Sequence, residues 1–164
     1  MRHVFGNQQG MTLSEVLVSM SIVSVGLVAL LSAVPLAGYA IQEGKQLSTA
    51  TFLANQRLEQ VRNAQWTVSP AADTLGVSAS AAVAPQSGAT ITFPDESPLV
   101  APYAEYGRRV RVTDCGVAPG CGGITNAGLR QVTVTVSYTP LTGVGQAAAG
   151  ATKSVVVSML MAER

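Results

Sequence analysis

The feature that most constrains this chain is a long apolar stretch near its N-terminus that carries no charge. Between Glu15 and Glu43 there is no Asp, Glu, Lys or Arg, and the run from Val16 to Ile41 is rich in Val, Leu, Ser, Ala and Ile. A helix of about 20 residues is enough to cross the hydrocarbon core of a bilayer, and this run exceeds that length. In hydrocarbon, a helix satisfies all the backbone hydrogen bonds of a single segment. We therefore predict a membrane-spanning helix here.

The helical pattern continues beyond the apolar run. Apolar residues recur at intervals of three and four, with polar and charged residues between them; the apolar set is Leu47, Ala50, Ala54, Leu58 and Val61. This spacing places the set on one face of an amphipathic helix. We expect one continuous helix from Met11 to about Ala64. Its hydrophobic first part is residues 11–41, and its amphipathic continuation is residues 42–66.

Strand-like segments occupy the C-terminal part of the chain. Tyr106–Thr113 and Gln131–Tyr138 alternate apolar with polar residues, as expected when one face of a sheet is buried. A third run, Lys153–Met161, is rich in Val and Met, and Ala89–Phe93 could add a fourth strand. We predict an α+β fold in which the long N-terminal helix packs on a small antiparallel β-sheet within a domain of residues 67–164.

Two other segments of this domain have a distinctive composition. Residues 69–88 are dominated by Ala, Ser, Pro and Gly and are typical of a loosely structured loop. Arg108, Arg109 and Arg111 form a basic cluster within the first main strand. A DNA-contacting patch is conceivable there, but a solvated strand face that discourages edge pairing is the better interpretation. The net charge of +1 gives no reason to expect nucleic acid as a partner.

The residue inventory argues against an enzyme. The single histidine is His3, in the polar N-terminal segment, so a Ser-His-Asp or Cys-His arrangement has no base in a folded site. A histidine metal site lacks ligands for the same reason. Lys45 and Lys153 leave a Ser-Lys hydrolase open by residue type alone, but neither lies in a recognisable motif. We therefore expect no catalytic residue, no metal, no cofactor and no small-molecule substrate.

The boundary before the apolar run carries the most specific motif in the chain. After the polar residues 1–10 the sequence reads Met11-Thr12-Leu13-Ser14-Glu15. This resembles the type III signal of type IV prepilins and pseudopilins, whose short polar leader ends in Gly. In that family a hydrophobic residue follows, usually with Thr-Leu after it and a Glu at the fifth mature position; Phe is most common where this chain has Met11. The resemblance implies that a prepilin peptidase cuts between Gly10 and Met11 on the cytoplasmic face and N-methylates Met11.

The order of leader and apolar stretch supports this interpretation independently. A conventional secretory signal is cut after its apolar stretch, at small residues. Here the small residue Gly10 precedes that stretch, so cleavage would leave the hydrophobic helix on the mature protein. Arg2, with few acidic residues nearby, favours a cytoplasmic N-terminus. We expect a single-pass inner-membrane protein whose C-terminal domain is periplasmic or extracellular, and which later enters a pilus at the cell surface.

Glu15 is the residue with the sharpest functional interpretation. A carboxylate in a membrane helix costs up to roughly 2.5–3.5 kcal/mol when it lies at the bilayer centre. Cleavage after Gly10 would create an α-amine on Met11, four residues upstream of Glu15. The resemblance implies that this amine on one subunit neutralises Glu15 of a neighbour and sets the register of assembly. In the plainer interpretation, Glu15 marks the interfacial end of a signal anchor, near a helix N-terminus where acids are favoured.

The two cysteines, Cys115 and Cys121, bracket a short loop of turn-forming residues. In an exported domain such a close pair is typical of a disulfide, and we expect one that staples the connection between two strands. Loop-entropy scaling gives about 2–3 kcal/mol of stabilisation for a ring of this size. Two free thiols are the alternative, and metal binding is disfavoured because only two candidate ligands are present.

A second motif narrows the expected function. Leu53–Arg62 looks like the "LA-x-Q-x-L-E-x-x-R" segment that is common in minor pilins of the PilV type and in pseudopilins of the type II secretion I type. We expect a minor type IV pilin, a structural subunit involved in pilus assembly and in pilus-dependent adhesion, twitching motility or DNA uptake. Its partners would be other pilins, contacted through the N-terminal helix. A type II secretion pseudopilin and a single-pass membrane protein that never assembles are the alternatives.

Overall fold

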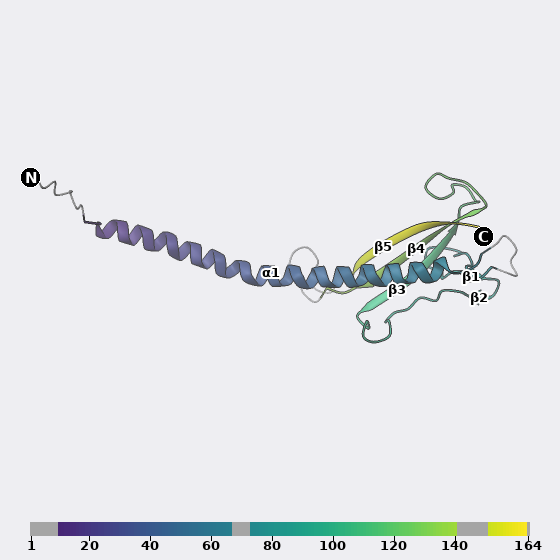
Figure 1. Ribbon diagram of the computed structural model, residues 1–164, viewed down its shortest axis with the longest axis horizontal. Coiled ribbons are helices and arrows are strands. Elements are labelled where there is room, and N and C mark those ends of the chain that lie inside the picture. Colours follow the sequence, from purple (N-terminus) through teal and green to yellow (C-terminus); the bar gives the residue numbers. More distant parts are fainter. Residues whose placement is uncertain (1–9, 67–72, 141–150, 164) are drawn as a thin grey trace, which may run out of the picture. The chain divides into compact units, whose positions relative to one another are not determined.

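The computed structural model describes residues 10–66, 73–140 and 151–163 (Figure 1). The elements in these residues are α1 (Leu13–Arg62), β1 (Gln86–Ser87), β2 (Thr90–Ile91), β3 (Tyr106–Asp114), β4 (Leu129–Tyr138) and β5 (Lys153–Ala162). The class is α+β, as predicted. The chain divides into two compact units, residues 1–41 and residues 42–164, and α1 contributes to both.

The first part of α1 has no apolar partner within its own unit. Every residue from Met11 to Ile41 is exposed, and α1 is long and apolar enough to cross a membrane. Four serine hydroxyls of this part donate to backbone carbonyls one turn earlier in the helix; they belong to Ser19, Ser21, Ser24 and Ser32. Hydrogen bonding within the helix is what a hydrocarbon environment requires of polar groups. This part of the chain therefore fits membrane insertion.

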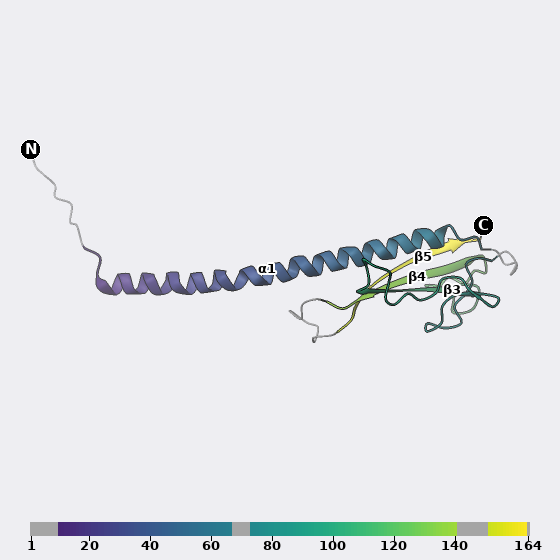
Figure 2. The same cartoon turned by 90° about the horizontal axis from the view of Figure 1, so that it is seen from below.

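The second part of α1 lies along one face of the main sheet, in the second unit (Figure 2). Its buried residues are Gln46, Ala50, Leu53, Ala54, Leu58 and Val61. This set confirms the predicted apolar stripe with one correction, because Leu47 is 49% exposed and the stripe starts at Gln46 instead. Leu47 lies one residue, or about 100° of helical rotation, away from Gln46 and therefore faces outward. The helix ends at Arg62, slightly before the predicted Ala64.

The main sheet contains the three predicted strands in the order β3-β4-β5, and each neighbouring pair is antiparallel. The register places Val134 of β4 between Val110 of β3 and Val157 of β5. Alternate valines of β3 and β4 are fully buried, and they form one core with the buried face of α1, Trp66 and Leu75; these valines are Val110, Val112, Val132, Val134 and Val136. Their period of two is the one that the sequence pattern indicated.

The expected fourth strand does not join this sheet. Thr90–Ile91, within the predicted Ala89–Phe93, pairs instead with Gln86–Ser87 in a separate two-stranded sheet. The outer edge of β3, where a fourth strand could have added, is already covered. There Ser78 donates its backbone N–H to Val112 O at 2.8 Å, and Glu96 donates to Arg108 O at 2.9 Å.

The segment before the strands is more ordered than its composition predicted. Residues 67–72 lie outside the described residues, but from Asp73 onward the chain has specific contacts. Leu75 is fully buried, and Val77 pairs with Gln86 in an isolated bridge. Gly76 has a φ of +69°, and a Cβ there would lie 2.5 Å from the backbone of Gln86. Gly76 is thus needed for a close backbone approach. The prediction of a loop holds for residues 73–88 apart from the two-residue β1, but their specific contacts correct the expectation that the loop is loosely structured.

Candidate functional site

The start of α1 is a capping box formed by Thr12 and Glu15. Thr12 immediately precedes the first helical residue, Leu13, and Glu15 lies in the first turn. The backbone N–H of Glu15 donates to Thr12 Oγ1 at 3.4 Å, and the backbone N–H of Thr12 donates to Glu15 Oε2 at 3.3 Å. The Glu15 N–H also donates to Thr12 O at 3.1 Å, so the Thr12 hydroxyl is its second acceptor, and the Glu15 carboxylate accepts the N–H of Thr12, which precedes the helix. The Glu15 carboxylate is folded back toward the helix N-terminus, where the helix dipole favours negative charge.

This capping box was readable from the sequence, since a Thr followed three residues later by a Glu is its signature. It gives Glu15 a defined position in a single chain, through contacts that neither the assembly interpretation nor the helix-terminus interpretation of the sequence included. The hydroxyl of Thr12 also lies 3.4 Å from Glu15 Oε2 and 3.0 Å from Ser14 Oγ. The carboxylate therefore has neutral hydrogen-bond donors and no cation among these contacts.

The predicted cleavage site precedes the helix. Gly10 and Met11 are both exposed and lie outside α1, and Met11 has 73% of its surface accessible. A Cβ placed on Gly10 would meet no atom within 4 Å. A peptide bond in an exposed, non-helical segment can enter a protease active site without unfolding a helix. Apart from Gly10, the predicted leader, residues 1–10, lies outside the described residues.

The two cysteines form the expected disulfide, far along the chain from Glu15 and in the second unit. Cys115 and Cys121 are joined with a Cα–Cα distance of 5.0 Å. Both are buried, and the loop they enclose contains a hydrogen bond from Gly120 N–H to Val117 O at 2.8 Å. The disulfide therefore staples the connection between β3 and β4. Its role is structural, since both sulfurs are consumed in the bond.

The basic cluster on β3 is divided between the two faces of the sheet. Arg108 is buried on the face that packs against α1, where its Nε and Nη2 both lie 2.7 Å from Glu96 Oε2. Its Nη1 donates to the backbone carbonyl of Leu53 in α1 at 3.3 Å. Arg109, the next residue, is exposed. The prediction of a solvated strand face is therefore wrong for Arg108, because tertiary contacts bury it.

Glu96 joins Arg108 to a second arginine, Arg57 of α1. Arg57 Nη2 lies 3.3 Å from Glu96 Oε1, and its guanidinium lies over the ring of Phe93 at 5.3 Å from the centroid. Burial is the main reason that the pKa of Arg57 lies below its ordinary value, and the Glu96 carboxylate acts in the opposite direction. One carboxylate thus connects the helix, the sheet and the segment around residue 96.

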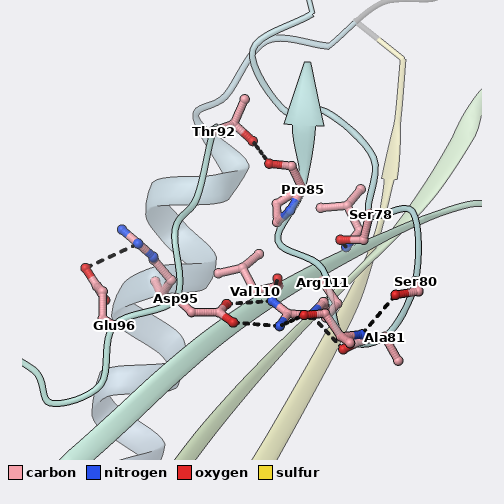
Figure 3. Close-up of polar contacts among 12 residues, drawn as sticks. Ser78, Ser80, Ala81, Pro85, Thr92, Asp95, Glu96, Val110 and Arg111 are labelled. Atoms are coloured by element: carbon pink, nitrogen blue, oxygen red, sulfur yellow. Dashed lines mark hydrogen bonds and ion pairs between the residues drawn. The ribbon is translucent and has the colours of Figure 1, made fainter. Parts of the chain in front are cut away.

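Arg111 makes the matching contact on the opposite face of the sheet (Figure 3). Its Nη1 and Nη2 lie 2.6 and 2.7 Å from the two carboxylate oxygens of Asp95, and its Nε donates to Ala81 O at 2.8 Å. The hydrogen bonds from Arg111 hold the pKa of Asp95 below its ordinary value, and those bonds raise the pKa of Arg111. The solvated-face interpretation is therefore wrong for Arg111 as well, and it describes Arg109 alone.

A further ion pair, which the sequence analysis missed, lies near the end of α1. Arg130 Nη1 lies 2.8 Å from Asp73 Oδ2, and the guanidinium lies over the ring of the buried Trp66 at 4.4 Å. The other oxygen of Asp73 accepts the backbone N–H groups of Leu75 and Gly76, each at 3.0 Å. These contacts hold the domain together and do not form a reactive centre. No periodic pattern marks Asp73 or Arg130, so the sequence offered no signal for the pair.

Comparison with known proteins identifies the N-terminal segment. Residues 6–31 match the family model described as the prokaryotic N-terminal methylation motif. The match spans the predicted cleavage site, Glu15 and much of the exposed part of α1. No curated protein and no solved structure gives a significant match to the chain. The motif implies processing by a prepilin peptidase and a structural role in a pilin-like assembly. The chain therefore carries the prokaryotic N-terminal methylation motif and is consistent with a type IV pilin-like protein.

Proposed function

We propose that this chain is a minor type IV pilin, made as a single-pass inner-membrane precursor and then incorporated into a pilus. The observation that carries the proposal is the coincidence of the methylation motif, residues 6–31, with a helical segment in which every residue from Met11 to Ile41 is exposed. An apolar helix without partners in its own chain needs a bilayer or neighbouring helices around it. The bilayer would surround this helix in the precursor, and neighbouring helices would surround it in the filament core.

Processing at the exposed Gly10–Met11 bond would produce the mature subunit. A prepilin peptidase would cut this bond on the cytoplasmic face and methylate the new α-amine of Met11. The C-terminal domain would then lie outside the inner membrane, where oxidising conditions allow disulfides to form and persist. The buried Cys115–Cys121 disulfide supports this side of the membrane for the domain.

The proposed role of Glu15 in assembly follows from the partners it has in a single chain. Its carboxylate accepts a hydrogen bond from Thr12 N–H, which leaves the negative charge without a neutralising cation among the contacts described above. Moving such a charge into an apolar filament core is costly unless a cation accompanies it. The α-amine on Met11 of a neighbouring subunit would supply that cation. Only axial positions that bring the amine to Glu15 would then be favourable, so the pair would fix the register.

The segment Leu53–Arg62 supports a minor pilin or a pseudopilin rather than an isolated membrane anchor. Leu53, Leu58 and Val61 are buried against the sheet, and Arg57 bridges to Glu96. The motif that the two classes share thus joins α1 to the C-terminal domain. A type II secretion pseudopilin is accordingly the second candidate. A deletion strain distinguishes the two: loss of twitching or piliation with normal exoprotein secretion supports the pilin, and the reverse pattern supports the pseudopilin.

The first test is the N-terminus of the mature protein, determined by intact mass and terminal peptide sequencing of membrane and sheared-filament fractions. We expect a chain that starts at N-methylated Met11 and lacks residues 1–10. A functional chain that still begins at Met1 would contradict the proposal, and a membrane protein that never assembles would replace it.

The second test isolates the role of Glu15. We expect Glu15→Gln to be cleaved and methylated normally but to reach sheared filaments more than about tenfold less than wild type, since pairing a carboxylate in an apolar environment is worth more than 1.4 kcal/mol. Glu59→Gln is the matched control, because Glu59 is an exposed residue of the same helix whose ion pair with Arg62 lies on the surface. Equal incorporation of the two variants would show that Glu15 only caps the helix.

A further inference from the structure

The outer face of the main sheet, opposite α1, carries a cleft of about 570 Å³. Its floor comes from two neighbouring strands, because Arg109 of β3 pairs in register with Thr135 of β4. Arg111 pairs in the same way with Thr133. Its wall is formed by residues 78–81. Sites for small molecules usually have volumes of about 300–1,000 Å³, so the cleft has the size of a ligand site.

The wall of the cleft is fastened to the sheet. Ser78 N–H donates to Val112 O at 2.8 Å, and Val112 N–H donates to Ser78 Oγ at 3.1 Å. Nε of Arg111 donates to Ala81 O at 2.8 Å (Figure 3). The shape of the cleft is therefore set within the chain itself, and a ligand would not have to order its wall.

Arg109 is the cation of this cleft that has no carboxylate bound to it. Its side chain is exposed and forms no ion pair or hydrogen bond among the residues that the structure describes. Arg111, by contrast, uses both of its Nη atoms on Asp95. The hydrogen bonds from Arg111 are the main cause of the lowered pKa of Asp95, and the charge of Arg109 is a smaller one. Because Asp95 neutralises Arg111, the charge of Arg109 remains available to a ligand.

Hydroxyl groups line the cleft beside this guanidinium. Those of Thr113, Thr133 and Thr135 form no hydrogen bond among the described residues, so each can both donate and accept. The hydroxyls of Ser78 and Ser80 accept backbone N–H groups and can still donate their own protons. Among the described residues, the lining has no aromatic side chain and no aliphatic one larger than alanine. A matching ligand is therefore polar on all sides and carries one negative charge.

We propose that this cleft binds a saccharide unit that bears a single carboxylate or sulfate group. Arg109 would form a bidentate pair with the anionic group, since a guanidinium presents parallel N–H donors to two oxygens. The threonine and serine hydroxyls would exchange hydrogen bonds with the hydroxyls of the sugar ring. The residue inventory that argues against an enzyme does not bear on this site, because binding needs no catalytic base.

Nucleic acid fits the cleft less well than such a sugar. The affinity of proteins for nucleic acid comes largely from neutralising several phosphates, and in this cleft only Arg109 has a charge to offer. Single strands also gain affinity by stacking their bases on aromatic rings, which are missing from the described lining. A sugar with one anionic group matches the cleft in both respects.

The expected affinity of a single site is low. Hydrogen bonds to the ligand replace hydrogen bonds to water, so their net gain is small, and we expect a Kd on the order of 1 mM. The binding itself is a property of the second unit, residues 42–164. Its use in attachment to a sugar-coated surface rests on the proposed function, which places this domain outside the inner membrane.

The test is a titration of the full chain in a detergent without a sugar headgroup, followed by NMR of isotope-labelled threonine methyl groups. The cleft is reported by Thr113, Thr133 and Thr135, and the internal controls are Thr90 and Thr125, which are exposed outside it. The probes are glucuronic acid, sulfated glucose and neutral glucose. We expect saturable shifts of the cleft threonines with at least one anionic probe, which identifies carboxylate or sulfate as the group. Neutral glucose should bind at least about tenfold more weakly.

Two matched pairs of variants test the assigned groups. Arg109→Gln should weaken binding of the anionic probe more than about tenfold, because hydrogen bonds between charged groups are the strong ones. Lys45→Gln is its control, since Lys45 is an exposed cation outside the cleft and its loss changes the net charge equally. Thr135→Val replaces a hydroxyl with a methyl group and should weaken binding about threefold. Thr90→Val should leave the affinity unchanged.

The proposal would be overturned by unshifted cleft threonines with both anionic sugars, or by equal losses from Arg109→Gln and Lys45→Gln. Equal binding of neutral glucose would show that the charge has no role. Equal binding of sodium sulfate would leave only a general anion site, and tighter binding of a short single-stranded DNA at the same threonines would make the ligand a nucleic acid. None of these outcomes affects the proposed function, which the N-terminus of the mature chain tests separately.

Discussion

The two outer strands of the main sheet have similar lengths, but their outer edges differ. Other segments of the chain cover the edge of β3, whereas no described segment covers the edge of β5. β3 spans 9 residues and β5 spans 10. β3 carries arginines among its valines and holds other segments of the chain against its edge. β5 carries only apolar and hydroxyl side chains between its terminal charges, and it holds no described segment there. At β3, charged side chains thus protect the edge by holding another segment of the chain against it.

The cover on β3 depends on two consecutive acidic residues. Asp95 pairs with Arg111 on the outer face of the sheet, and Glu96 pairs with Arg108 on the helix-facing side. Neighbouring side chains of an extended segment point in opposite directions, so two consecutive residues can form ion pairs on both faces of the strand. Ser78 adds a third attachment through Val112. The edge is thus held by side-chain pairs on both faces and by backbone hydrogen bonds.

Removing the Arg108–Glu96 ion pair on the helix-facing side should have the largest effect on the free energy of unfolding. We expect Arg108→Ala to lower the free energy of unfolding by about 2 to 3 kcal/mol, because it strands the Glu96 carboxylate near the core and removes a donor from Leu53 O. Glu96 is 32% exposed and keeps Arg57, which holds the cost below that of a fully buried pair. Urea unfolding of the detergent-solubilised chain, followed by the fluorescence of its one tryptophan, Trp66, measures the change.

The adjacent residue provides the control for this prediction. Arg109 has the same side chain on the same strand but is exposed on the opposite face. Arg109→Ala should change the free energy of unfolding by less than about 0.5 kcal/mol, as is usual for surface positions. Equal losses for the two variants would mean that β3 needs its arginines for their general charge and not for the specific contact with Glu96.

The disulfide also stabilises the chain at the end of β3. Its removal should lower the free energy of unfolding by less than Arg108→Ala does. We expect the double variant Cys115→Ser and Cys121→Ser to lose about 2 kcal/mol of stability by loop-entropy scaling. Reduction of the wild-type protein should produce the same loss in the same unfolding experiment. The double variant itself should not respond to reductant, and a response would place the effect outside this bond.

The β5 edge should tolerate what the β3 edge does not. We expect Val156→Lys to change the free energy of unfolding by less than about 0.5 kcal/mol, since the long stem of a lysine can lie on the sheet while its charge stays in water. A loss above about 1 kcal/mol in a monomeric sample would show that Val156 belongs to the packing of its own domain.

The contrast between the two edges also explains how far the fold could be predicted from sequence. The helix and the three main strands were predictable because each has its own period of apolar residues, which depends on neighbouring positions only. The sequence pattern placed Leu47 on the buried face, but Leu47 is exposed and Gln46 is buried instead. Such a pattern therefore locates the buried face of a helix to within about one residue. The capping box at Thr12 and Glu15 was equally local, as was the motif around Gly10.

The edge of β3 was beyond local reasoning. Arg108 and Arg109 are chemically identical and adjacent, and the period of two places Arg108 on the buried face with Val110 and Val112. What the pattern could not supply is the partner of Arg108, because Glu96 lies in a segment without periodicity. Asp73 and Arg130 form their pair across a much larger separation in sequence, 57 positions against 12 for Glu96 and Arg108. Ion pairs between distant segments depend on the tertiary fold. The sequence therefore predicted a solvated basic face, whereas in the structure Arg108 and Arg111 form ion pairs with Glu96 and Asp95. The predicted roles of Gly10, Met11 and Glu15 still await the tests above.

The smallest expected effect is a pH dependence of the stability that the Asp95–Arg111 ion pair contributes. Arg111 holds the pKa of Asp95 below its ordinary value in the folded protein, whereas the unfolded chain has a value near about 3.9. A lowered carboxyl pKa contributes stability that is present above the unfolded value and is lost as the pH falls through the folded one. The loss of stability below about pH 4 should therefore be shallower in Asp95→Asn than in wild type, in urea unfolding repeated from pH 6 to pH 3.

Arg111→Met should flatten the same part of the acid limb, because the pair needs both partners. The change is expected to be small, since the Asp95 side chain is 38% exposed and water screens the interaction. If either variant kept the full wild-type slope, the Asp95–Arg111 contact would not contribute to folding. The cover of the β3 edge would then depend on Glu96 and the backbone hydrogen bonds alone, and the outer face of β3 would resemble that of β5 more closely than its contacts indicate.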